Sequence, residues 1–170
     1  MARRQFTGTG ALYFVPIITN KGAPTVAQIL AGVNLTGWMV RNGLKRPQAG
    51  NVVDTADAST RFNKTDVGTY GGDKMEITFH RDTKLSQDTA WTTLPRDTIG
   101  YIVPADNGFA QNAGTGIGTP TGTPTIGDRC QVWPVTVNTR VPMDTAENES
   151  NKFTVELVVT DEPNLDAVVA

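Results

Sequence analysis

Lys74-Met75-Glu76-Ile77-Thr78-Phe79-His80-Arg81 is the stretch that decides the fold class, because apolar and polar residues alternate along it. Side chains of a β-strand point to opposite faces in turn, so Met75, Ile77 and Phe79 share one face. The pattern predicts a strand with one buried and one solvated face. The segment from Phe153 to Val159 alternates in the same way. Together the two segments favour a mainly β fold.

Working outward, other stretches predict further strands and two short helices. The additional strands are expected at residues 11–18, 37–41, 98–103 and 130–137. A short helix is expected at 24–31, with Pro24 early in it and Gly32 closing it. A second helix is expected at 86–94, with Ser86 as N-cap and Pro95 ending it.

The 170 residues suit one domain, and no internal repeat is visible. Three segments lack the apolar pattern of an element. We expect a long polar loop at about 42–73 and a Gly/Thr/Pro-rich loop at about 107–128. The last residues, about 161–170, are expected to form an exposed tail. A loop as long as the first is unusual in a compact domain and is normally functional or disordered.

The composition excludes several classes of protein. Hydrophobic residues make up 38% and charged residues 19%, and Thr, Gly, Asn and Pro fill much of the remainder. That mixture favours strands joined by turns over a helix bundle. No apolar run approaches the roughly 20 residues of a membrane helix, so no membrane anchor is expected. Cys130 is the single cysteine, which excludes an internal disulfide and fits synthesis in a reducing cytoplasm.

The net charge of −2 conceals opposite charges at the two ends of the chain. Residues 1–53 hold six Lys or Arg and no acid, a charge of +6. Residues 141–170 hold seven acids and one lysine, a charge of −6. Two interpretations stay open: the ends lie near one another in the monomer, or they meet across subunits and fix the register of assembly.

The sequence offers little that could perform catalysis. His80 is the sole histidine and falls on the polar face of the alternating strand, where a surface role is expected. Cys130 adjoins an apolar strand and is expected to be a small buried residue. The glycines of 114–118 precede Pro120, not a helix, so no dinucleotide loop is expected. Scattered loop acids lack calcium-site spacing. No catalytic residue, cofactor or metal is predicted.

The order of these elements resembles the tail tube proteins of lambda-like and other long-tailed (siphovirus) bacteriophages, over nearly the whole chain. The matching segments are 12–15, 24–29, 34–37, 76–82 and 88–94. The stretches 127–137 and 152–160 are similar to the C-terminal halves of tail proteins from phages of actinobacteria. Two departures from the lambda case are expected: no appended immunoglobulin-like domain, and a longer loop near 114–125.

The resemblance implies a tail-tube-type β-sandwich or small barrel with one or two short helices and long loops. It implies a structural virion protein that assembles into hexameric rings, whose sheets join into an inner barrel with no free edges. The rings would stack head to tail. Implied partners are other copies of the chain, a tape measure protein, tail tip and terminator proteins, and phage DNA in transit through an acidic lumen.

Residues expected to take part in self-assembly are the charged and aromatic ones near the chain ends and in the first long loop. They are Arg3, Arg4, Phe6, Lys45, Arg46, Arg61, Phe62, Asp161 and Glu162. Two alternatives remain. One is another ring-forming virion part, such as a tail terminator, head-completion or capsid decoration protein. The other is a monomeric β-sandwich binding module, which would need clustered exposed aromatics, whereas Trp38, Trp91 and Trp133 are spread over different elements.

Overall fold

The computed structural model of the chain describes residues 10–47, 49–54, 65–71, 74–82, 84–106, 108–109, 123–143 and 149–170. For 49–54 and 65–71 it describes the backbone alone. The elements in these ranges, in chain order, are β1 (Ala11–Val15), α1 (Val26–Leu30), β2 (Val33–Asn34), β3 (Met39–Lys45), β4 (Ala49–Asp54), β5 (Thr65–Gly71), β6 (Lys74–His80), α2 (Thr89–Thr93), β7 (Ile99–Ala105), β8 (Arg129–Met143), β9 (Lys152–Val159) and β10 (Asn164–Val168). The fold is mainly β, as predicted.

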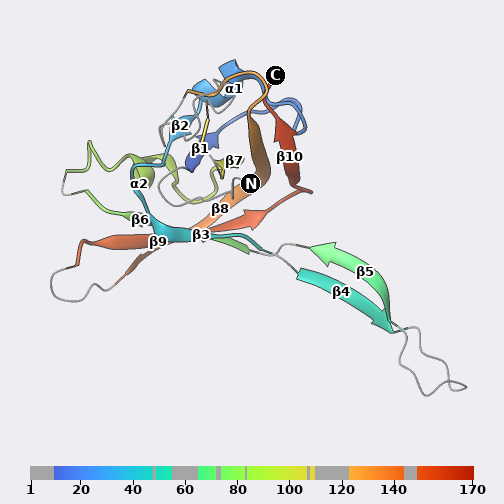
Figure 1. The fold of residues 1–170 in the computed structure, drawn as a ribbon. Helices are drawn as coiled ribbons and strands as arrows, with labels where there is room; N and C mark the ends of the chain where they lie inside the picture. The colour runs from blue at the N-terminus through green and yellow to red at the C-terminus, as the bar shows by residue number, and fades with distance from the viewer. Residues whose placement is uncertain are drawn as a thin grey trace, which may run out of the picture.

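Eight of these strands form one antiparallel sheet. The order of neighbours is β2-β1-β7-β8-β9-β6-β3, with β10 also beside β8 (Figure 1). The 15-residue strand β8 connects two halves of this sheet. Its first part pairs with β7 and β10, and the part from Val135 to Met143 pairs with β9. β3, β6, β9 and the second part of β8 therefore form four neighbouring antiparallel strands, called the four-stranded sheet below.

The alternation in β6 and β9 builds the larger of two cores. Met75, Ile77 and Phe79 are fully buried and lie opposite Leu157, Val155 and Phe153. Leu12 and Phe14 of β1 join the same cluster, together with residues of β7, β8 and α2. The alternating pattern thus predicted both the strands and their buried face.

A second core lies on the other face of β1. Tyr13 and Val15, the neighbours of Leu12 and Phe14, pack there with Ile29 of α1 and Ala167 of β10. Burial raises the pKa of the Tyr13 phenol, against the opposing effect of a hydrogen bond with Asn34. Because β1 is covered on both faces, all five of its residues are buried.

The two helices begin in different ways. Before α1, Thr25 Oγ1 accepts from the Gln28 N–H at 3.2 Å, and the Thr25 N–H donates to Gln28 Oε1 at 3.1 Å. This reciprocal capping box explains the short helix predicted there. For α2, the expected N-cap Ser86 is wrong, because the helix begins after Asp88. The Asp88 carboxylate makes no capping bond and accepts instead from Arg81.

Three predicted boundaries differ from the structure. The long loop expected at 42–73 is wrong where β3 continues to Lys45 and where β4 and β5 form a hairpin. The exposed tail expected at 161–170 is wrong, because β10 pairs with β8 and buries Ala167. The strand expected at 130–137 runs on to Met143. Of the loop expected at 107–128, residues 107 and 110–122 lie outside the described part of the chain.

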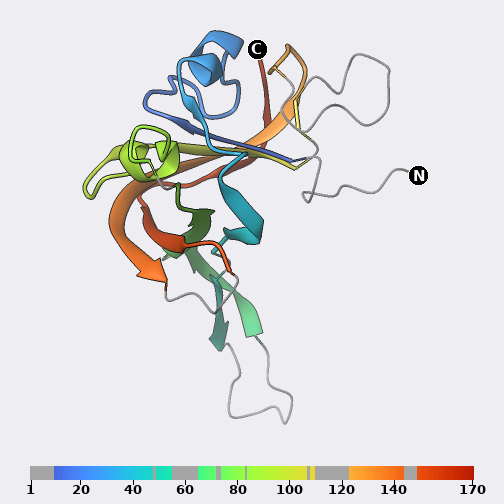
Figure 2. The same cartoon turned by 90° about the vertical axis from the view of Figure 1, so that its left-hand side faces the viewer.

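The hairpin of β4 and β5 forms a two-stranded sheet of its own. It extends from the ends of β3 and β6 and projects away from the body (Figures 1 and 2). The chain thus consists of a body with two cores and an arm that leaves from one end of the four-stranded sheet.

Candidate assembly surface

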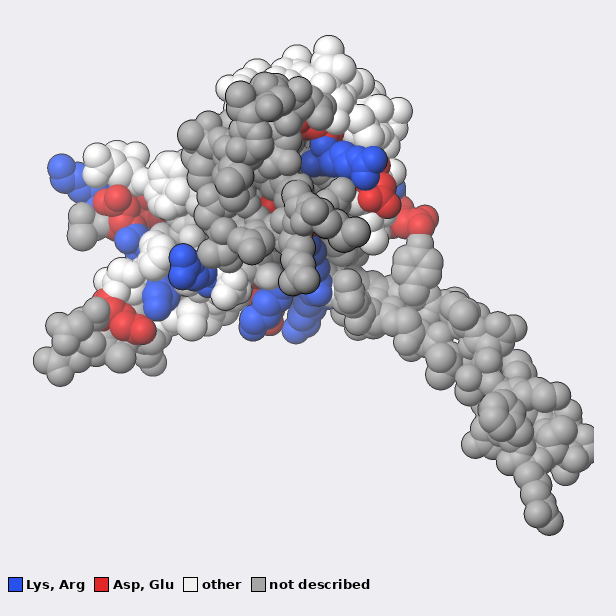
Figure 3. Space-filling view, in the orientation of Figure 1, with Lys and Arg blue, Asp and Glu red and all other residues white. Residues whose placement is uncertain are grey.

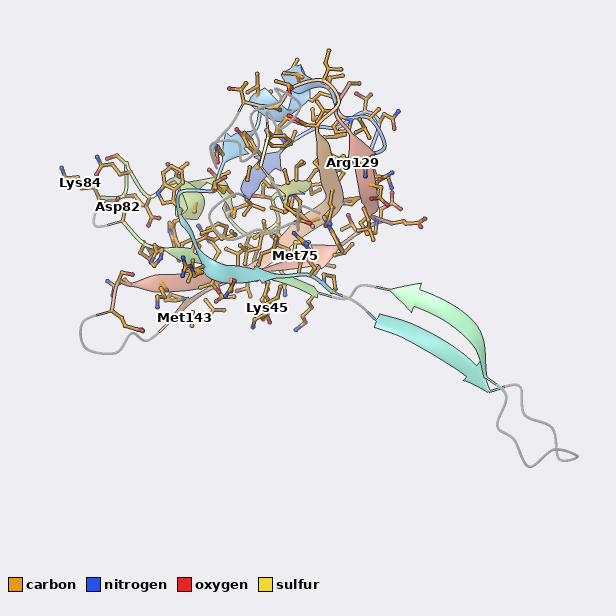
Figure 4. The ribbon with its side chains drawn as sticks, in the orientation of Figure 1. Lys45, Met75, Asp82, Lys84, Arg129 and Met143 are labelled. Atoms are coloured by element: carbon orange, nitrogen blue, oxygen red, sulfur yellow. The ribbon has the colours of Figure 1, made fainter. Side chains whose placement is uncertain are left out.

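One face of the four-stranded sheet is buried and the other is open. Met75 points into the core, whereas Lys45 and Met143 point to the opposite side of the sheet (Figure 4). Register pairs extend this open face across all four strands. One row is Lys45, Glu76, Glu156 and Thr139, and another is His80, Lys152 and Met143. No described element covers this face, so it is a surface for water or for a partner.

The open face carries charges of both signs. Lys45 Nζ lies 2.9 Å from Glu76 Oε2, and this contact lowers the pKa of the Glu76 carboxyl. Glu156 stands directly opposite Glu76 in the register, and Lys74 and Lys152 lie on the same face. Lys and Arg side chains gather on the lower surface of the body, the side to which Lys45 points (Figure 3). The described part of this face is mixed in sign rather than acidic.

Both outer strands of the four-stranded sheet have a free edge in the described part of the chain. β3 ends the order of neighbouring strands. β7 pairs with β8 only over Trp133–Thr136, so residues 138–143 of β8 have β9 on one side and no described strand on the other. A free edge presents unpaired N–H and C=O groups that can accept another strand.

Two arginine side chains stack on Trp91 next to the free end of β8 and hold that end in place. The Arg81 and Arg140 guanidinium carbons lie 3.9 and 4.2 Å from the Trp91 ring centroid. Arg140 Nη1 also donates to the Trp91 carbonyl, and Trp91 packs edge-on against Phe153 with 5.0 Å between centroids. Arg81 Nε donates to Asp88 Oδ2 at 2.6 Å. Cation–π contacts of this kind contribute about 0.5–2 kcal/mol each.

The structure places only part of the predicted self-assembly set. Lys45 lies on the open face at the free edge of β3. Arg46 follows it and is paired with Asp106 within the chain, with 2.5 Å between Nη2 and Oδ1. The other candidates at the start of the chain and in the first long loop lie outside the described residues: Arg3, Arg4, Phe6, Arg61 and Phe62.

Asp161 and Glu162 lie together and bind the basic end of the chain. Lys21 Nζ donates to Asp161 Oδ2 at 2.6 Å and to the Glu162 carbonyl at 2.8 Å. Lys21 lowers the pKa of the Asp161 carboxyl through this bond. This pair supports the interpretation in which the oppositely charged ends meet within the monomer.

Cys130, His80 and the acidic side chains are the groups whose surroundings bear on reactivity and metal binding in the described part of the chain. Cys130 is buried, and its burial raises the pKa of the thiol to about 12. His80 lies on the open face with Nδ1 2.7 Å from Ser150 Oγ. Within the described ranges, no three His, Cys, Asp or Glu side chains gather as metal ligands. Neither helix of those ranges can cross a membrane, since each is only five residues long.

Sequence reasoning missed Arg140 and Pro142 at the free end of β8, because the strand expected at 130–137 ended before both residues. A signal existed for Pro142, because a proline within a strand indicates an edge or a bulge. The stack on Trp91 left no local signal, since Arg140 is 49 residues away in the chain.

Comparison with known proteins bears on the fold and on the family. A family model described as "Phage tail tube protein" matches residues 1–170. No curated protein matches the sequence. A solved structure described as the sheath/tube terminator of an extracellular contractile injection system, PVC, in the extended state is similar, with a TM-score of 0.59 and 7% identity. The match covers 98% of this chain and 99% of that chain.

A second similar structure comes from the 6-fold symmetrised baseplate of the anti-feeding prophage (AFP). Its TM-score is 0.52 at 10% identity, over 95% of both chains. At such identities the likeness concerns the fold alone. The fold described above therefore recurs in these two solved structures across nearly the full length of this chain.

Proposed function

The chain belongs to the phage tail tube protein family, and on that premise we propose that it polymerises as stacked rings of six subunits to form the tube through which phage DNA is delivered. The family establishes a structural role in the phage tail. Ring formation, the number of subunits and passage of DNA are the proposed part.

The observation that carries the proposal is the four-stranded sheet with two free edges and one open face. Its strands alternate in direction from β3 through β6 and β9 to β8. β8 of one copy can therefore pair antiparallel with β3 of the next without breaking the alternation. A ring closed in this way has no free edge in its inner sheet, which removes the liability of exposed strands.

In this arrangement the open face of the sheet lines the lumen. The opposite face is filled by the larger core, so it is not available to a channel. The described residues give this face Lys45, Lys74 and Lys152 against Glu76 and Glu156. Charges of both signs on one face avoid a strongly basic wall, to which DNA phosphates would adhere.

The arm supports head-to-tail stacking. Because the β4–β5 hairpin leaves from one end of the sheet only (Figure 1), the two ends of the subunit differ. A contact between unlike ends repeats without closing and produces a filament. Arg61 and Phe62, in the segment between β4 and β5, and Arg3, Arg4 and Phe6 are proposed to contribute to contacts between subunits.

We further propose that the assembled tube encloses a tape measure protein and meets tail tip and tail terminator proteins at its ends. A second candidate function is the terminator ring itself, which the description of the PVC structure favours. A terminator would form one ring and no filament. The rings of that alternative use the same sheet edges, so the two functions differ in stacking alone.

The test is assembly of the purified chain at high concentration, observed by negative-stain electron microscopy and sedimentation velocity. We expect hollow tubes with a regular axial repeat. Single rings that do not stack would support the terminator instead. If only monomers appear, purified tail tip complex is added as an initiator, and continued absence of rings contradicts the proposal.

A further inference from the structure

The direction of the backbone groups at the free edge of β8 follows from two hydrogen bonds. The Val137 N–H donates to the Thr98 carbonyl and the Asp97 N–H donates to the Val137 carbonyl, both at 2.9 Å. The backbone N–H and C=O of Val137 therefore point toward the β7 side, away from β9. Its register partner Leu157 must face away from β8 in turn.

β9 pairs with β6 without interruption, so the backbone N–H and C=O groups of Leu157, Val155 and Phe153 all point toward β6, away from β8. Their partners on β8 past the bulge are Arg140 and Pro142. Both residues thus direct their backbone groups to the free edge. Arg140 offers a donor and an acceptor there, whereas Pro142 offers a carbonyl and no N–H.

The free edge of β8 has three features that protect edge strands from pairing with unmatched strands. β8 has a bulge between Val137 and Thr139. Arg140 is a charged residue on the inward face, held by Trp91. Pro142 removes one donor. Bulges, inward charges and prolines at an edge each reduce pairing with unmatched strands.

The free edge of β3 has an irregularity of its own. Met39 pairs with Phe79 and Leu44 with Ile77, so five positions on β3 span two on β6. Between them Asn42 has a φ of 61°, and a Cβ on Gly43 would lie 2.7 Å from the Thr78 carbonyl. By the same alternation, Leu44 directs its backbone groups away from β6, toward the free edge.

We propose that these two irregular edges are matched, and that Pro142 selects β3 of a second copy of this chain in one register. Pairing Arg140 with Leu44 of the neighbour places Pro142 opposite Asn42. The position on β8 that lacks an N–H, Pro142, then lies opposite the irregular segment of β3. A regular strand, or the same edge shifted by two residues, leaves an unmatched carbonyl opposite Pro142. This inference rests on the proposed function.

The register is tested by disulfide cross-linking. In the proposed pairing, Thr139 lies opposite Lys45 of the neighbour in a pair without backbone bonds, with Cα atoms about 4.5 Å apart, within disulfide range. Within one subunit these residues occupy the first and fourth strands, about 14 Å apart, which excludes an internal bridge. Lys45→Cys with Thr139→Cys is expected to form a ladder of linked oligomers. Lys45→Cys with Val141→Cys is the control for a shifted register.

The role of Pro142 is tested by adding Pro142→Ala to the control pair. The variant restores a donor, so we expect links between positions 45 and 141 to rise at least five-fold and association to begin at a lower concentration. Pro95→Ala, at an exposed proline off this edge, is the matched control and should change neither. The backbone amide that Pro142→Ala introduces should exchange rapidly in the monomer, measured by NMR, because it faces the free edge.

The outcomes separate this inference from the proposed function. Tubes that link equally well through both cysteine pairs, or an unchanged pattern with Pro142→Ala, overturn the selection by Pro142. Slow exchange of the introduced amide in the monomer overturns the edge geometry, whether or not tubes form. Wild-type protein that forms no ring with an initiator contradicts the proposed function, and the amide measurement still decides the geometry.

Discussion

At the scale of single residues, Asp88 is a fully buried carboxylate that needs a partner for its charge. Its side chain is fully buried, Oδ2 accepts from Arg81, and Oδ1 has no partner within the described residues. An uncompensated buried charge is expensive, so this carboxylate depends on the Arg81 guanidinium. The pair links the end of β6 to α2, and α2 presents Trp91 to the free end of β8.

We expect Asp88→Asn to lower the free energy of unfolding by about 2 kcal/mol, because it removes the charge that Arg81 neutralises. The loss should fall below the 3–5 kcal/mol typical of a fully buried pair, since Arg81 is 29% exposed. Urea denaturation measures it. Asp97→Asn is the control, because Asp97 and Arg96 form an exposed pair at 3.8 Å. Equal stability of the two variants would contradict a structural role for the buried pair.

Cys130 supplies a prediction about alkaline pH. Burial raises the pKa of its thiol to about 12, so at pH above about 9 the unfolded chain releases this proton and the folded chain does not. Stability is therefore complete below the ordinary thiol pKa and declines as pH rises from 9 toward 12. Near pH 10.5 the loss amounts to up to about 2 kcal/mol.

The measurement compares wild type with Cys130→Ala by urea denaturation at pH 8 and pH 10.5. The gap between the two proteins should change in favour of the alanine variant at the higher pH. Alkylation by iodoacetamide at pH 8.5 should proceed in guanidinium and fail in the folded protein. Rapid alkylation of folded protein would show that the thiol is accessible.

Residue-level prediction from the sequence succeeded where a residue's own surroundings in the chain decide its place. His80 lies on the polar face of a strand and Cys130 in a core, both as predicted. It failed where distant residues meet. Lys21 and Asp161 are 140 positions apart, and the sequence left open whether the charged ends meet within one subunit. The structure shows the pair and leaves the other residues of the self-assembly set as proposals.

At the scale of elements, the strongly alternating strands β6 and β9 were predictable and the others less so. β10 escaped because its burial does not alternate: Leu165 is exposed, Ala167 is buried, and a register shift separates Asn164 from Ala167. β4 and β5 escaped because Gly, Asn, Asp and Thr dominate their sequences and they pair only with each other in the described structure. Such residues are typical of turns, and tertiary pairing overrides that preference.

The last two residues of the chain connect the segment before α1 with the segment before β8, beside the smaller core. The Ala170 N–H donates to the Pro24 carbonyl, and the Val169 N–H donates to the Asp128 carbonyl. Val169 is 1% exposed, whereas its neighbour Val168 is 43% exposed. An exposed tail would tolerate a charge at either position, and a packed strand would not.

We therefore expect Val169→Asp to destabilise the fold by more than about 3 kcal/mol, because it buries an unpaired carboxylate. Val168→Asp, at the neighbouring position that faces solvent, should change stability by less than about 0.5 kcal/mol. Thermal and urea denaturation of the two variants give the comparison. Similar stabilities would mean that β10 does not pack on β8 in solution.

At the scale of the whole molecule, the residues that stabilise the fold differ from those proposed to contact other subunits. Two cores on opposite faces of β1 hold the body together, and Met39 and Leu44 of β3 pack against the larger one. Among the described residues, β3 and the end of β8 each keep one strand edge without a partner strand. The same division explains the limits of sequence reasoning, because apolar periodicity reports on cores and carries no information about edges that another copy completes.

The arm allows the last prediction, since the described ends of its two strands are close enough to be joined directly. Asp54 and Thr65 are direct register partners in the hairpin, so a two-residue Asn-Gly turn can replace residues 55–64. Because β4 and β5 form a separate sheet, we expect the shortened chain to unfold within about 2 °C of wild type. Its rings should form through the β3 and β8 edges and fail to stack, so electron microscopy should show single rings in place of tubes. Tubes of normal length from the shortened chain would show that residues 55–64 do not make the stacking contact, and loss of both rings and tubes would assign them to the contact within the ring.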